Sequence, residues 1–376
     1  AYDATGNPLP AGGATVTVTR QSGTGSIGAV TDVGDGTYTA TVTAPAAVGS
    51  GVFVATFGGN PVLGGTASQV QATVTYSVGA ANAAASTLTP AAASITANGT
   101  STQVLTVSAR DASGNALSTG GATVSIPRLS GTGTIGSVTD VGNGTYTATV
   151  TAPAAVGTGT FVATLGGAPV QDGAGTQTQA VVTYVVGAAS AARSTLTPPN
   201  SGITADGTST QLLTVTALDA TGNPLTTGGS TITITRLSGS GTIGPVADVG
   251  NGTYTAVVTS PTVAGSGIFV ATLGGAPVQG GTASQVQARV GYGAGPAVAS
   301  NSLLTPPTAS LQANPVRTQR LIVTARDAGG NHLSTGGAVV TITRLSGIGT
   351  IGPVTDIGNG TYAAVVTAPS TVGSGV

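Results

Sequence analysis

The sequence contains no cysteine, methionine or tryptophan, and it also lacks lysine and glutamate, so every acid is aspartate and every base is arginine. Without cysteine there is no disulfide, no thiolate nucleophile and no Cys-ligated zinc site. Without lysine there is no Schiff-base amine and no Lys–Asn isopeptide cross-link. The single histidine, His332, excludes a metal site built from several histidines. These absences remove most enzyme chemistries, and we therefore expect neither catalysis nor a cofactor.

Charge and long apolar runs are also scarce. Charged residues make up 6% of the 376 residues, and the net charge is −1. Such a chain offers no basic patch to a phosphate backbone, so nucleic acid is not an expected partner. Thr, Ser and Gly interrupt every apolar stretch before it reaches the roughly 18 residues of a membrane-spanning helix. We expect no membrane span in this segment.

The abundant residues are glycine, with 61 copies, and threonine, valine and alanine, which together favour short strands and turns. The stretch 140–153 recurs almost unchanged around Tyr38, Tyr254 and Tyr362, a step of 108 residues each time. The period predicts copies of one small domain at 1–79, 80–187, 188–295 and 296–376. The first copy is expected to lack its first strands and the last copy its last strands. Linkers rich in Ala and Gly are expected near Ala80, Ala188 and Pro296, the first of them at 78–85.

Within the second copy, apolar residues alternate with threonine or other polar residues in several short segments, as expected for half-buried strands. Asn143-Gly144 and Gly166-Gly167 predict two-residue hairpin turns. Pro90 interrupts the first strand, where an edge strand can change sheets. About seven short strands in roughly 100 residues are typical of an immunoglobulin-like sandwich. The predicted fold class is all-β, with tandem immunoglobulin-like β-sandwich domains in an extended array.

Both incomplete copies leave a sheet edge open in this reading of the sequence. A window on a longer array is the favoured explanation. The alternative is that neighbouring chains supply the missing strands, which would make the molecule a strand-exchanged polymer.

A turn of the form Asp-x-x-Gly-Asn recurs in every copy, beginning at Asp3, Asp111, Asp219 and Asp327. Carboxylate and amide oxygens suit calcium, and Asp111, Asp219 and Asp327 are the candidate ligands. Only about three acids fall in each copy, however, whereas calcium needs six or more oxygens gathered at one point. We favour a structural turn, in which Asp accepts local backbone N–H bonds and Gly-Asn takes the left-handed conformation.

Three other recurring features have a structural and a functional interpretation. Asp140 and its equivalents Asp32, Asp248 and Asp356 are expected to tie a hairpin loop to itself, since the second carboxylate of a glycosidase is missing from most copies. The Asn-Gly-Thr triplets at Asn98, Asn143, Asn251 and Asn359 fit the N-glycosylation pattern, but the same letters form a tight turn, which we favour. The arginines at 20, 128, 236 and 344 could form salt bridges with Asp in the same domain or meet an anionic sugar, and we favour the salt bridge.

The segments 94–102 and 105–115 resemble bacterial Ig-like repeats of the invasin and intimin adhesin group, and the stretch from Gly142 to Val170 is similar to the filamin-type Ig repeat. The resemblance implies an extracellular bacterial rod whose repeats hold a binding tip away from the cell. No tip domain is present in this sequence.

The expected function is therefore the shaft of a bacterial surface adhesin or a component of a surface filament, at the cell surface or secreted, acting as a spacer. Expected partners are the neighbouring repeats of the same chain, with identical chains in a filament as a further candidate. A tip that lies outside this segment would bind the host or surface partner, a glycan or a protein. A glycan- or protein-binding adhesion module remains the alternative, together with the strand-exchanged polymer.

Overall fold

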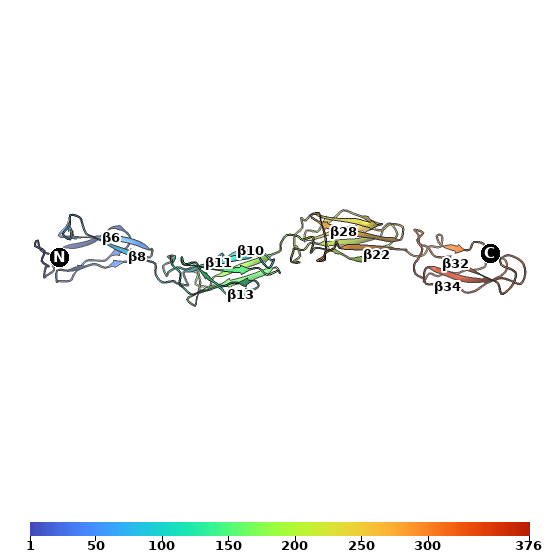
Figure 1. Cartoon of the computed structure of the whole chain (residues 1–376), viewed down its shortest axis with the longest axis horizontal. Coiled ribbons are helices and arrows are strands. Elements are labelled where there is room, and N and C mark those ends of the chain that lie inside the picture. The colour runs from blue at the N-terminus through green and yellow to red at the C-terminus, as the bar shows by residue number, and fades with distance from the viewer. The chain divides into compact units, whose positions relative to one another are not determined.

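The computed structural model describes residues 1–376, which form strands joined by turns and loops (Figure 1). It contains no helix that is long and apolar enough to cross a membrane. Contacts divide the chain into two units, Ala1–Val185 and Val186–Val376, each of which holds one terminal and one inner copy of the repeat. The two units are described separately below.

The second copy is a sandwich of two sheets. The first sheet has the strand order β14-β16-β11-β9, with β15 also paired to β16, and the second has the order β10-β20-β17-β13. The strands of the first sheet are β9 (Thr87–Thr89), β11 (Thr102–Ser108), β14 (Thr134–Ile135), β15 (Thr139–Asp140) and β16 (Thr145–Thr151). Those of the second are β10 (Ala92–Thr96), β13 (Arg128–Gly131), β17 (Gly157–Val162) and β20 (Gln179–Val185). A small third sheet contains β12 (Val124–Ser125), β18 (Thr164–Leu165) and β19 (Ala168–Pro169).

Pro90 lies where the chain leaves one sheet for the other, as predicted. Before it, β9 pairs antiparallel with β11, and after it, β10 runs parallel to β20 in the opposite sheet. Because proline has no N–H to donate, the crossing costs the ladder no hydrogen bond.

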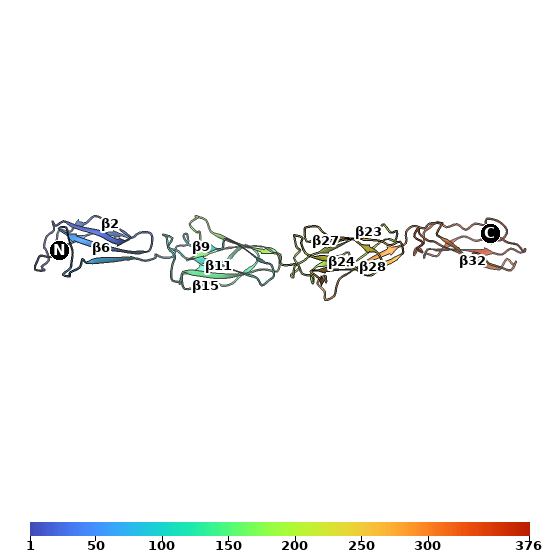
Figure 2. The same ribbon diagram turned by 90° about the horizontal axis from the view of Figure 1, so that it is seen from above.

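The third copy repeats this arrangement, and Figure 2 shows its two layers, with β23 and β27 in one and β24 and β28 in the other. The first sheet consists of β21 (Thr195–Thr197), β23 (Thr210–Thr216), β25 (Thr242–Ile243), β26 (Ala247–Asp248) and β27 (Thr253–Thr259). The second consists of β22 (Asn200–Thr204), β24 (Ile232–Gly239), β28 (Gly265–Leu273), β29 (Ala276–Pro277) and β30 (Gln287–Gly293).

The terminal copies each form mainly one of the two sheets. In the first copy, β1 (Val16–Gly23), β6 (Gly49–Phe57), β7 (Asn60–Pro61) and β8 (Gln71–Tyr76) make a four-stranded sheet. Two short pairs accompany it, β2 (Ser26–Ile27) with β5 (Val42–Thr43) and β3 (Thr31–Asp32) with β4 (Tyr38–Thr39). The fourth copy contains β31 (Leu303–Thr305), β32 (Thr318–Thr324), β33 (Thr350–Ile351), β34 (Thr355–Asp356) and β35 (Thr361–Thr367) in one sheet.

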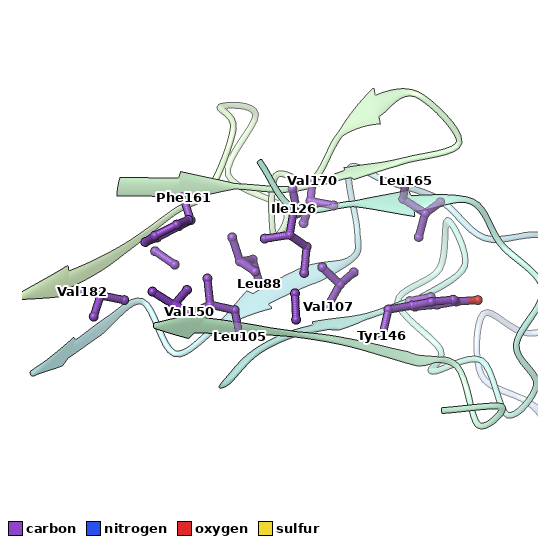
Figure 3. Close-up of a cluster of buried hydrophobic side chains, with 14 of the residues drawn as sticks. Leu88, Leu105, Val107, Ile126, Tyr146, Val150, Phe161, Leu165, Val170 and Val182 are labelled. Atoms are coloured by element: carbon purple, nitrogen blue, oxygen red, sulfur yellow. The ribbon is translucent and has the colours of Figure 1, made fainter. Parts of the chain in front are cut away.

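The core of the second copy lies between its two sheets, and alternate residues of the longer strands β11, β16 and β20 point into it (Figure 3). Leu105, Val107 and Val150 are completely buried, and Tyr146 and Phe161 are no more than 1% exposed. Most of the threonines that alternate with them face outward and are half-buried or exposed. The strand alternation predicted from the sequence is confirmed here and in the equivalent core of the third copy.

The two predicted hairpin turns had different outcomes. Gly166 and Gly167 form a two-residue turn between β18 and β19, with φ of +59° and +84°, as the sequence predicts. The prediction of a two-residue turn at Asn143-Gly144 is wrong, because four residues, 141–144, separate β15 from β16. Gly142 and Gly144 take the left-handed positions instead of Asn143, with φ of +84° and +83°. Gly142 can do so at no steric cost because it has no side chain.

The first linker is shorter than the sequence predicts. Ala83 is 8% exposed and belongs to the core of the second copy. Ala81 forms a bridge with Asp111, and the Asn82 N–H donates to the Arg110 carbonyl at 2.7 Å. The second half of the predicted linker is therefore part of the following copy, which leaves residues 77–80 as the connection after β8.

Candidate functional site

The Asp-x-x-Gly-Asn turn of the second copy follows β11 and is organised by one buried carboxylate. Asp111 is 5% exposed, and its Oδ1 accepts the backbone N–H groups of Ser113 at 3.0 Å and Asn115 at 2.9 Å. Gly114 has φ of +86°, and its carbonyl accepts Nη1 of Arg110 at 2.8 Å. Asn115 does not share the left-handed conformation, so that part of the prediction is wrong. Glycine alone supplies the reversal.

The other oxygen of the same carboxylate holds the linker. Oδ2 of Asp111 accepts the Gly79 N–H at 3.0 Å and the side-chain amide of Asn115 at 2.9 Å. The linker bond recurs in both later copies, from Gly187 to Asp219 at 3.0 Å and from Gly295 to Asp327 at 2.8 Å. Each turn therefore fastens the chain that leads into its own copy.

N–H donors face the carboxylate oxygens of the three candidate calcium ligands, Asp111, Asp219 and Asp327. Asp219 and Asp327 are 1% and 3% exposed, and each accepts backbone and side-chain N–H groups from its own turn as well as from the linker. Donor hydrogens occupy the positions around the carboxylate that a cation would need. The structure brings together no group of three or more acidic or histidine side chains that could hold a metal ion.

These hydrogen bonds also set the protonation of the turn. The side-chain amide of Asn115, with help from the Gly79 N–H, lowers the pKa of Asp111 to about 2. At Asp219 and Asp327 burial alone raises the pKa, but the donated hydrogen bonds outweigh it and the net pKa is lowered. Hydrogen bonds to the ionised form favour that form, so the carboxylates stay charged at neutral pH.

The asparagine that ends the turn reaches the preceding copy. In the first unit, Nδ2 of Asn115 donates to the Ala46 carbonyl at 2.7 Å. In the second unit, Nδ2 of Asn331 donates to the Thr262 carbonyl at 2.8 Å, and the Ala264 N–H donates to Oδ1 of Asn331 at 2.8 Å. The sequence interpretation treated these asparagines only as turn formers. Every pair of residues keeps its spacing in a 108-residue repeat, so the constant 32 residues between the linker glycine and the turn aspartate do not single out this contact.

The recurring arginines do not form the predicted salt bridges. The guanidinium of Arg128 donates to the carbonyl of Gly133. Arg20, Arg236 and Arg344 make the equivalent bond in their own copies. The Tyr184 hydroxyl donates to the neighbouring Thr132 carbonyl at 3.1 Å. Each arginine therefore pairs with a backbone carbonyl of the loop that follows it. The prediction of an Asp partner is wrong.

The remaining candidates also stabilise loops. Asp140 accepts the N–H of Gly142 at 2.8 Å in its own hairpin and that of Gly121 at 2.7 Å in a distant loop. Oδ1 of Asn143 accepts the N–H of Thr145 at 3.1 Å and its hydroxyl at 2.6 Å, as a turn requires. His332 is exposed.

A model of the family described as invasin, domain 3, matches the chain at residues 1–79, 82–187, 190–294 and 298–376. Among curated proteins no relative was found. Among solved structures, the Escherichia coli adhesin FdeC is 24% identical over 79% of this chain and 92% of its own, with a TM-score of 0.46. InvD of Yersinia pseudotuberculosis is 27% identical over 67% of this chain and 72% of its own, with a TM-score of 0.40. Invasin, described as a bacterial integrin-binding protein, is 19% identical over 99% of this chain and 69% of its own, with a TM-score of 0.45.

Proposed function

The chain belongs to the invasin domain 3 family, and on this premise we propose that it is a spacer segment of a bacterial surface adhesin. From the 108-residue period of the sequence we place its domains at 1–79, 80–187, 188–295 and 296–376. In this role each domain supplies its own core, and the number of domains sets how far a binding region stands from the cell. The segment lies outside the cell, at the surface or on a secreted molecule.

The observation that carries the proposal is the recurring bond between a linker glycine and the buried aspartate of the next copy, at Asp111, Asp219 and Asp327. Domains joined by a free linker move relative to one another by default. A spacer has to limit that motion, and a linker amide fixed to a buried carboxylate does so at the same place in successive copies. The connection in the first unit is also short, at residues 77–80.

The outer surface suits the same role. The outward face of β11 and β16 carries mainly threonine, with Thr102 opposite Thr151 and Thr106 opposite Thr147. Hydroxyl groups keep such a face hydrated, while a net charge of −1 gives little electrostatic steering toward charged partners. A surface of this kind fits a spacer, which only has to stay hydrated, better than it fits a site that binds a charged ligand.

The proposal is tested by deleting residues 188–295, one full period, so that the repeat continues in phase. Solution scattering then compares the maximum dimension of the full chain and the shortened chain. A spacer loses roughly 30–40 Å, the length of a domain whose strands have about 8–10 residues at about 3.3 Å each. An unchanged dimension, or a compact particle for the full chain, would overturn the proposal. Accessibility of the segment to an external protease on intact cells tests its location.

A further inference from the structure

The junctions of the two units differ in how many hydrogen bonds cross them from the turn asparagine. Asn115 makes one such bond, to the Ala46 carbonyl. Asn331 makes two, to the Thr262 carbonyl and from the Ala264 N–H. Asn331 is buried at 9% exposure, whereas Asn115 is half-buried. The preceding copy therefore covers more of the turn asparagine in the second unit.

The difference coincides with the third residue of the turn. This residue is Ser113 in the second copy, Thr221 in the third and Gly329 in the fourth. A Cβ atom added at position 329 would lie 2.6 Å from the Thr262 carbonyl oxygen, closer than real Cβ atoms approach a backbone atom. The glycine is therefore needed for the approach of the preceding copy.

Backbone conformation gives no other reason for this glycine. Gly329 lies outside the left-handed region, whereas the neighbouring Gly330, with φ of +82°, takes the left-handed position that Gly114 takes in the second copy. Ser113 at the equivalent place also lies outside the left-handed region, so the backbone at this position does not require glycine.

The asparagine is fixed by its own turn before it meets the neighbour. Asp327 accepts the backbone N–H of Asn331 at 2.8 Å and its side-chain amide at 3.0 Å. The second hydrogen of that amide and its oxygen then serve the preceding copy, so both donors and the acceptor are used. Asn301 donates to the carbonyls of Asp327 and Ala328 at 2.9 and 3.0 Å and holds the turn backbone in place.

We propose that the third residue of the turn, Ser113 in the first unit and Gly329 in the second, sets how tightly the two copies of that unit are joined, with the asparagine as the residue that contacts the preceding copy. Glycine at position 329 allows the junction with two bonds, whereas Ser113 accompanies a junction with one bond. The occupant of this surface is the loop at Thr262 and Ala264, or at Ala46, of the preceding copy in the same chain. The proposal rests on the spacer function, because tightness matters only where the copies have to keep their mutual orientation.

The cysteine-free chain allows a direct test by spin labelling. Single cysteines replace Val257 and Val365, two exposed residues one period apart, in the full chain, and pulsed electron paramagnetic resonance measures the distribution of distances between the labels. Gly329→Thr should broaden this distribution by about twofold, toward the freedom of loosely joined domains. The control is Gly202→Thr in the third copy, an exposed glycine outside the left-handed region with no atom within 4 Å of an added Cβ.

The reverse change tests the same rule in the first unit. Ser113→Gly should narrow the distribution between labels at Thr41 and Thr149, which are exposed and again one period apart. A Gly329→Thr distribution as narrow as that of the parent chain, or no response to Ser113→Gly, would refute the proposal.

A separate pair of labels at Val339 and Val365 reports on the fold of the fourth copy itself. If Gly329→Thr changes the distances between that pair, Asn331→Ala replaces Gly329→Thr as the test variant. A broader Val257–Val365 distribution in Asn331→Ala then supports the proposal, and an unchanged width contradicts it. The outcome is independent of the deletion experiment, because junctions can respond to residue 329 even if chain dimensions do not scale with copy number.

Discussion

The two junctions use one motif to make contacts of different strength. In the first unit the turn carries Ser113, and Asn115 makes one bond to the preceding copy. In the second unit the turn carries Gly329, and Asn331 makes two. The aspartate, the left-handed glycine and the linker bond are common to both turns. The two turns differ at their third residue, and by our proposal this single position varies the joint between otherwise similar domains.

The exposed turn at Asp3 makes the local bonds of the motif. Its carboxylate accepts the N–H groups of Thr5 and Asn7 at 2.9 Å each and the side chain of Asn7 at 3.0 Å. These match the local bonds of the buried turns at Asp111 and Asp327. The turn is thus a local structure, and the linker bond and the contact with the preceding copy are added to it.

The largest effect is expected from removing the buried carboxylate. Asp327→Ala removes the acceptor of two N–H groups, that of the buried Asn331 and that of the half-buried Gly295, which should lower the free energy of unfolding of the fourth copy by about 2–3 kcal/mol. Native-state hydrogen exchange followed by NMR should show faster exchange of these two amides. Asp3→Ala removes the same local bonds in water and should cost clearly less. Equal losses for the two variants would contradict the distinction between a junction turn and an exposed turn.

A smaller effect is expected from removing the asparagine. Asn331→Ala takes away the acceptor of the Ala264 N–H and the donor to the Thr262 carbonyl, each worth about 1 kcal/mol. The Ala264 amide should exchange faster, which tests the bond directly. Asn115→Ala removes one crossing bond and should change the first junction less. Asn359→Ala is the matched control, because that exposed asparagine accepts bonds only from Thr361 in its own copy.

A weaker, graded effect should follow from acid. The lowered pKa of Asp111, about 2, means that its ionised form is favoured in the folded state. Its contribution to stability is complete above the pKa of an unfolded aspartate, about 3.9, and is lost as the pH falls from there through about 2. The distance distribution across the first junction should broaden over that range. Asp111→Asn, which carries no titrating group, should remove this pH dependence, and a variant that still responds in the same way would assign it to another group.

Much of the fold could be predicted because its signals are local and repeated. The 108-residue period gave the copies, and the alternation at Tyr146, Ala148 and Val150 gave a buried face. The four-residue loop after Asp140 could not be read from Asn143-Gly144, because a second glycine just before this pair takes one of the left-handed positions. The same residue types are compatible with a two-residue turn and with a four-residue loop.

The junction was harder to predict because its bonds join residues far apart in sequence. The turn at Asp111 was expected, but its partners Gly79 and Ala46 lie 32 residues away from Asp111 and 69 residues away from Asn115. No local pattern reports such a contact. Gly329 carried no signal by itself either, since its value depends on a carbonyl of the preceding copy.

The smallest effect is expected at Thr262, where the two junctions differ in side chain but use the same backbone group. Ala46 and Thr262 occupy equivalent positions and each offers a carbonyl to the turn asparagine. Thr262→Ala keeps that carbonyl and gives the second unit the residue of the first, so stability should change by no more than about 0.5 kcal/mol, as at other exposed positions. The distribution between labels at Val257 and Val365 should keep its width. A broadening comparable to that of Gly329→Thr would mean that the threonine side chain, and not the missing Cβ of the glycine, makes this junction the tighter of the two.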